Sequence, residues 1–172
     1  MSTCNTYNII IASSEDIVTE RKTVHEICWG LNKGILPNHH KVSFQIKEWE
    51  KVFSSALSPR DIIKSLTDEC DILILIFHKK FAVPSASLEQ FLETYDQWKS
   101  LKKPDILSFF RTAKISTLKE LKNPQLLKVF ELKEKIDHNS TMICESFSAP
   151  NEFCEKVQDT LDIWISKKAE NQ

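Results

Sequence analysis

A run of eight residues, Asp71-Ile72-Leu73-Ile74-Leu75-Ile76-Phe77-His78, constrains the fold most strongly. Consecutive apolar residues between polar ends are typical of a parallel strand that is buried on both faces. Parallel sheets of this kind often carry nucleotide sites at the carboxyl ends of their strands. Yet the chain has only two glycines, Gly30 and Gly34, and both fall where the first helix is expected to end. Their placement excludes the glycine-rich phosphate loops of P-loop NTPases and of dinucleotide-binding dehydrogenases.

Strand and helix patterns alternate along the whole chain. The predicted strands are residues 7–12, 42–46, 71–77, 106–110 and 141–144. The predicted helices begin near Ser13, Ser58, Ser87, Asn123 and Ser148. Because crossovers between parallel strands are right-handed, this order predicts a three-layer, doubly wound α/β fold with a mainly parallel five-stranded sheet. We expect one domain over residues 1–172, with a core from about 7 to 165 and a frayed tail over 167–172.

Composition narrows the class of protein. The 172 residues include 23 Lys+Arg and 24 Asp+Glu, and this balance argues against a dedicated nucleic-acid binder, whose affinity depends on neutralising phosphates. The five cysteines are widely spaced, with no CxxC pair and no zinc spacing, so we expect free thiols and no metal site. No signal peptide or membrane span is predicted, and we expect a cytoplasmic protein without a membrane partner.

Segments that flank the predicted strands carry hydroxyl, acidic and aromatic residues. The first segment is Ile9 to Ser14, followed by Asp16 and the pair Glu20-Arg21. The second is Trp49-Glu50, after the second predicted strand. Cys70-Asp71 and the run from His78 to Pro84 flank the third strand, and the next helix begins with Ser85-Ala86-Ser87-Leu88-Glu89-Gln90-Phe91. In this order and spacing they resemble the TIR-like family, including its branch of domains of unknown function. The resemblance covers about residues 7–165 and implies a flavodoxin/TIR-like fold.

The resemblance implies two alternative functions. TIR domains either cleave the nicotinamide–ribose bond of NAD, as hydrolases or cyclases, or assemble as signalling modules, often in antiviral or innate immune defence. NAD is then the substrate, no cofactor is needed, and the partner is a second copy or a STAND-type defence protein. The enzymes use a glutamate on the helix after the third strand, where this chain has Gln90 beside Glu89. Gln90 therefore indicates a non-catalytic protein, a Glu→Gln form that is silenced, or a catalytic role for Glu89.

Candidate residues near the first strand have two interpretations each. Ser13 and Ser14 either cap the first helix or face a phosphate or ribose together with Asp16. Glu20 and Arg21 either form an exposed ion pair, or Arg21 turns into the cleft, where its guanidinium would bind a phosphate or carboxylate.

Candidate residues farther along the chain are equally open. Trp49 and Phe81 either stack on a base or close the core. His78 is either a packed or solvated histidine or a catalytic base. The resemblance implies that Ser85 and Ser87 bind the ligand, although Ser87 also fits the start of a capping box.

Two other classes of protein have a similar doubly wound α/β layout: one is an enzyme and the other a signalling receiver domain. A nucleoside 2-deoxyribosyltransferase-like enzyme needs a carboxylate nucleophile, for which Asp16 and Glu89 are the available pair. A receiver domain needs an acidic pair after the first strand, which Glu15-Asp16 supplies, and an aspartate at the end of the third strand. His78 stands at that second position, so we set the receiver aside.

Overall fold

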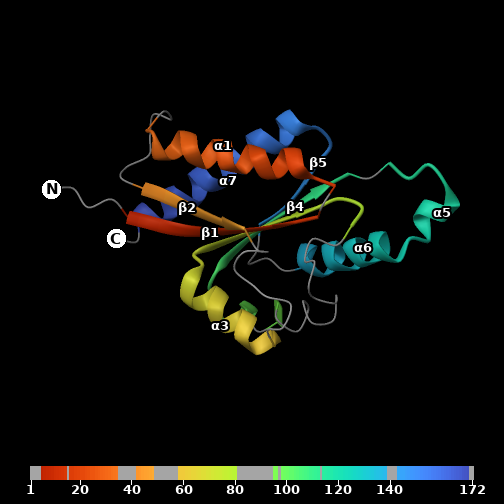
Figure 1. The fold of residues 1–172 in the computed structure, drawn as a ribbon, viewed down its shortest axis with the longest axis horizontal. Helices are drawn as coiled ribbons and strands as arrows, with labels where there is room; N and C mark the ends of the chain where they lie inside the picture. The colour runs from red at the N-terminus through yellow and green to blue at the C-terminus, as the bar shows by residue number, and fades with distance from the viewer. Residues whose placement is uncertain are drawn as a thin grey trace.

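A computed structural model of the chain describes residues 5–14, 16–34, 42–48, 58–80, 95–96, 98–112, 114–138 and 143–170. The strands are β1 (Asn5–Ser13), β2 (Val42–Glu48), β3 (Ile72–Phe77), β4 (Asp105–Arg111) and β5 (Ile143–Phe147). The helices are α1 (Val18–Asn32), α3 (Pro59–Glu69), α5 (Leu118–Leu121), α6 (Pro124–Asp137) and α7 (Pro150–Glu170). All strand pairs are parallel, in the order β2-β1-β3-β4-β5 (Figure 1). The predicted three-layer α/β fold is confirmed.

β3 lies at the centre of the sheet and is buried on both faces. All six of its residues, Ile72–Phe77, have 0% exposure. Neighbouring residues of a strand point to opposite faces, so its even-numbered residues join one core cluster and its odd-numbered residues join the other. The first cluster includes apolar residues of α1 and α7, and the second includes those of α6 with Tyr95 and Trp98. Figure 1 shows α1 and α7 on one side of the sheet, with α3 and α6 on the other.

Two predicted helix starts are confirmed by their caps. Ser58 Oγ accepts a hydrogen bond from Asp61 N at 3.2 Å at the start of α3. Asn123 Oδ1 accepts one from Gln125 N at 2.9 Å at the start of α6. A proline follows each cap, at the position where a helix does not need the missing N–H group.

The predicted serine cap of α1 is wrong. The helix begins at Val18, and Ile17 at its N-cap position makes no side-chain hydrogen bond. Ser13 instead continues β1, in register with Ile76 of β3. The hydroxyl of Ser13 accepts a hydrogen bond from Arg21, one turn into the helix, so it is not available to the first N–H groups.

α1 also ends later than predicted. It runs through Gly30 to Asn32, and the chain turns at Gly34, whose φ of 66° favours glycine. Glycine inside a helix costs about 1 kcal/mol relative to alanine. Leu31, next to it, is only 4% exposed, and burial of a leucine side chain contributes about 1.5–3 kcal/mol. Burial of Leu31 therefore offsets the cost of Gly30.

The last strand and helix continue beyond their predicted ends. β5 is Ile143–Phe147 and runs past the predicted end at 144, because it pairs with β4 from Leu107↔Ile143 to Arg111↔Phe147. The predicted positions 141 and 142 lie outside the described residues. α7 continues past Lys167 to Glu170, where the sequence suggested a frayed tail.

The segment between β4 and β5 also differs. α5, capped by the Thr117 hydroxyl, was not predicted, because one helical turn carries no apolar period. The apolar residues in the first half of α6 divide into two sets: Leu126 and Val129 are buried, but Leu127 and Phe130 are 43% and 40% exposed.

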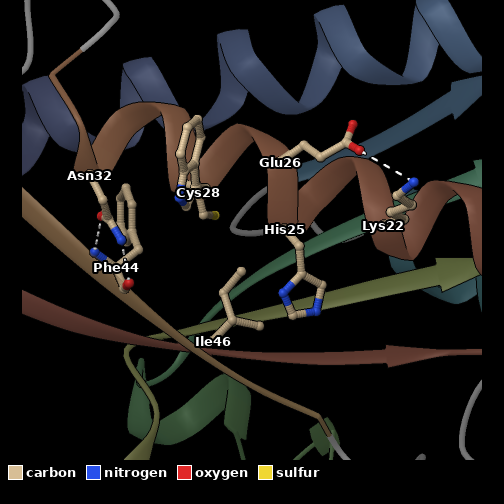
Figure 2. Close-up of a pocket in the computed structure, with 8 residues that line it drawn as sticks. Lys22, His25, Glu26, Cys28, Asn32, Phe44 and Ile46 are labelled. Atoms are coloured by element: carbon tan, nitrogen blue, oxygen red, sulfur yellow. Dashed lines mark hydrogen bonds and ion pairs between the residues drawn. The ribbon is translucent and has the colours of Figure 1, made fainter.

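A side chain from α1 closes part of the free edge of β2. Asn32 Nδ2 donates a hydrogen bond to Phe44 O at 2.8 Å, and Phe44 N donates one to Asn32 Oδ1 at 2.6 Å (Figure 2). β2 is an edge strand whose sheet partner is β1. The asparagine amide therefore replaces a neighbouring strand at one residue and shields backbone groups that would otherwise invite pairing with another chain.

Replacing Asn32 by alanine should destabilise the protein by about 1–2 kcal/mol, because two hydrogen bonds to the backbone are lost. Urea unfolding measures the change. Asn151→Ala, at an exposed position in the first turn of α7, is the matched control. A loss for Asn32→Ala within the ~0.5 kcal/mol typical of ordinary surface positions would contradict this role.

Candidate functional site

In each of four strands, every second side chain points to the face of the sheet that α1 covers. These side chains are apolar along the strand, and a polar one follows at its carboxyl end. Alternation places Glu48 of β2, Ser13 of β1, His78 after β3 and Arg111 of β4 one step beyond the last apolar residue on that face. We call these four residues the polar row. The strands are parallel, so all four lie at the carboxyl edge of the sheet. β1 and β3 are neighbours there while their crossovers diverge, and doubly wound folds bind ligands at such a switch point.

Arg21 of α1 binds the β1 and β2 members of the polar row. Its Nε donates to Ser13 Oγ at 2.7 Å, and its Nη1 lies 3.6 Å from Glu48 Oε2. His25, one turn further on, places Nε2 at 2.7 Å from Glu48 Oε1. Arg21 thus turns toward the sheet, and the prediction that it enters the cleft edge is favoured over the exposed ion pair.

Asp16 and His78 join the loop after β1 to the end of β3. His78 Nδ1 lies 2.9 Å from Asp16 Oδ2, and Lys79 N donates to the same oxygen at 3.4 Å. Burial raises the pKa of Asp16, but the nearby Ser14 hydroxyl, the backbone and the hydrogen bond with His78 favour the charged form and together bring the pKa below its ordinary value of 3.8. At neutral pH, Asp16 is therefore a charged acceptor that orients the imidazole across the switch point.

Glu20 and Arg111 join α1 to the end of β4. Arg111 Nη1 donates to Glu20 Oε1 at 3.0 Å. The Glu20 side chain is 1% exposed and that of Arg111 is 33% exposed. The alternative interpretation of Glu20-Arg21 as an exposed pair is therefore wrong, since each residue has a different partner and Glu20 is buried.

The structure brings together the predicted site residues that it describes. Ser13, Ser14, Asp16, Arg21 and His78 all lie at the carboxyl edge, Ser13 in contact with Arg21 and Asp16 in contact with His78. The other predicted residues lie outside the described residues: Trp49, Phe81, Ser85, Ser87, Glu89 and Gln90.

The sequence motifs did not single out His25, and they left Glu20 unassigned. Glu48 and Arg111 lie in the ranges 48–53 and 110–112, which follow predicted strands and where we expect the site from the fold, but neither was named as a site residue. One signal for the two strand residues was available. Each lies an even number of positions after a core residue that faces α1, namely Phe44 for Glu48 and Phe109 for Arg111. No local signal identifies the partner of Glu20, because Arg111 follows it by 91 positions.

A groove of about 510 Å³ lies beside the polar row, between α1 and β2 (Figure 2). Its lining residues are Lys22, His25, Glu26, Cys28, Trp29, Asn32, Phe44 and Ile46. Figure 2 shows His25 pointing from α1 toward Ile46 of β2. Because His25 also binds Glu48, the groove and the polar row share one hydrogen-bonded connection.

Two cysteines of the described residues are buried thiols of the core. Burial raises the pKa of Cys28 and of Cys70 to about 12, so neither thiol forms a thiolate at neutral pH. No group of three or more metal-ligating side chains occurs among the described residues. In the same part of the chain, no helix combines the length and apolar character needed to cross a membrane.

Replacing His78 by alanine should raise the pKa of Asp16, because His78 contributes both a hydrogen bond and a favourable charge. The folded-state pKa lies below the ordinary value, so the charged carboxylate stabilises the fold above that value. This stabilisation is lost as the pH falls through the folded-state pKa. An NMR titration of the Asp16 carboxyl carbon measures the effect, with His138→Ala, at the exposed end of α6, as control. If Asp16 in the protein without substitutions titrates with a midpoint at or above 3.8, the proposed effect of His78 on its pKa is contradicted.

Comparison with known proteins identifies the family without an activity. No curated protein matches the chain. The family described as "Domain of unknown function (DUF4062)" matches residues 8–162. The match runs from β1 into α7 and includes the four residues of the polar row and the residues of α1 that contact them. The chain therefore belongs to the DUF4062 family.

Proposed function

We propose that this chain is a TIR-like protein that binds NAD or a related nucleotide at the polar row and acts on its nicotinamide–ribose bond, in antiviral or innate immune defence. The observation that carries the proposal is the contact between Asp16, after β1, and His78, after β3. It crosses the switch point between these strands, the place where doubly wound folds bind nucleotides. Arg21 lies at the same edge, bound to Ser13 at the end of β1. At the same edge, the N-cap residue of α1, Ile17, supplies no side-chain cap to the first N–H groups of the helix, and uncapped N–H groups at a helix start favour an anionic ligand.

The proposed chemistry breaks the bond between ribose C1′ and the nicotinamide nitrogen. The electron pair of that bond passes to the nicotinamide ring, which leaves as neutral nicotinamide. In hydrolysis, water forms the new bond to C1′ and loses a proton; in cyclisation, an adenine nitrogen takes the place of water. The ribose carries positive charge in the transition state, and a carboxylate stabilises it. Gln90 matches a glutamate in size but carries no charge, so we propose that the chain with Gln90 binds the nucleotide and cleaves it slowly.

Nicotinamide release from NAD tests this proposal. Gln90→Glu should raise the rate by about a hundredfold or more, the effect of one well-placed electrostatic group. Gln45→Glu, at an exposed position of β2, makes the same chemical change on a different part of the sheet and should leave the rate unchanged.

The outcome also separates the candidate residues. Equal activity in the natural chain and in Gln90→Glu would move the catalytic role to Glu89, and Glu89→Gln should then abolish release. No release from any folded form at high protein concentration would contradict the enzyme proposal.

The second candidate is a non-catalytic assembly module. Five exposed apolar side chains on and before α5 and on α6 favour it: Ile115, Leu118, Leu121, Leu127 and Phe130. Leu118 is 76% exposed, and Figure 1 shows α5 standing away from the sheet. Absence of nicotinamide release combined with concentration-dependent self-association in sedimentation velocity would favour this candidate. A monomer at every concentration would count against it.

A further inference from the structure

Glu20 is the one charged side chain that is buried among the described residues, at 1% exposure. Its Oε1 accepts a hydrogen bond from Arg111, while its Oε2 is buried and has no hydrogen-bond partner in the described part of the chain. Burial of a carboxylate with one ionic partner costs free energy, and a well-packed apolar pair could join α1 to β4 without that cost. The arrangement therefore favours a role for the pair beyond a structural tie.

Arg111 is held at the carboxyl edge by its backbone as well. Thr112 N donates to Phe147 O at 2.8 Å, which extends the pairing of β4 with β5 one residue beyond Arg111. Within the described residues, Glu20 is the one partner of the Arg111 guanidinium. The contact uses Nη1, so most of the planar set of five N–H donors remains open, and the side chain is 33% exposed.

The two arginines of the network differ in this respect. Arg21 divides its donors between Ser13 and Glu48. Among the described residues, the Arg111 guanidinium contacts one buried anion, and its side chain is one-third exposed. A guanidinium held in this way is preorganised to bind two oxygens of a single anionic group in a bidentate manner.

We propose that Arg111 binds the diphosphate of a nucleotide and that Glu20 is its positioning residue. This inference rests on the proposed function, because it assigns a subsite within the same nucleotide site. β4 lies next to β3, about 4.8 Å away in a sheet. A ribose near His78 would therefore leave its diphosphate within reach of Arg111.

Calorimetric titration of the 172-residue chain with ADP, adenosine and inorganic pyrophosphate tests the inference. ADP should bind more tightly than either of the other two. Arg111→Lys keeps the charge but loses the planar fork, so it should weaken ADP binding by about tenfold or more and leave adenosine binding unchanged. Lys122→Gln, which removes an exposed positive charge after α5, is the control and should bind ADP as the natural chain does.

Glu20→Gln separates positioning from charge. It removes a negative charge beside the proposed anion site, so electrostatics alone predicts tighter ADP binding. Loss of positioning predicts weaker ADP binding with unchanged adenosine binding. Both variants are close in size to the natural residues, and urea unfolding verifies that each is folded.

Four results would overturn the inference. They are ADP binding that is unaffected by Arg111→Lys, ADP binding that tightens in Glu20→Gln, no preference for ADP over adenosine, and pyrophosphate binding as tight as that of ADP. Nicotinamide release reports on the proposed function separately. If NAD is cleaved but ADP affinity is unchanged in Arg111→Lys, this inference alone is overturned. Arg111-dependent ADP binding without cleavage supports the inference and contradicts the enzyme proposal.

Discussion

Burial of β3 on both faces is the constraint on which the rest of the structure depends. Its six side chains have no exposed surface, so helices must cover the sheet on two sides, and parallel pairing with β1 and β4 follows from the crossovers that carry those helices. At about 1.5–3 kcal/mol for each fully buried large aliphatic side chain, this strand contributes a substantial part of the driving force for folding. It also fixes the switch point beside it.

The same alternation that builds the core builds the polar row. β1, β2, β3 and β4 each send every second residue toward the α1 side of the sheet, and these residues change from apolar to polar at the carboxyl edge. α1 serves both parts. Its apolar stripe packs on the sheet, and its first two turns supply Glu20, Arg21 and His25 to the polar residues. A change that moves α1 would therefore alter core packing and the proposed site together.

Much of the fold could be predicted from local sequence. The central strand and the caps at Ser58 and Asn123 depend on neighbouring residues, and the structure confirms them. The start of α1 could not be predicted in this way, because Arg21 takes the Ser13 hydroxyl that local rules assign to a cap. Likewise, the bounds of β5 depend on its register with β4, and burial of Glu20 depends on a partner 91 positions away. Long-range pairing decided these features.

Amide chemical shifts of isotope-labelled protein, titrated with NAD, would show where a nucleotide binds. A site on the polar row predicts the largest changes at residues around the switch point and the end of β4, namely Ser14, Asp16, Lys79 and Thr112. Residues that line the groove between α1 and β2, such as Lys22 and Trp29, should change little. Changes confined to that groove, or none at saturating NAD, would contradict a nucleotide site at the carboxyl edge of the sheet.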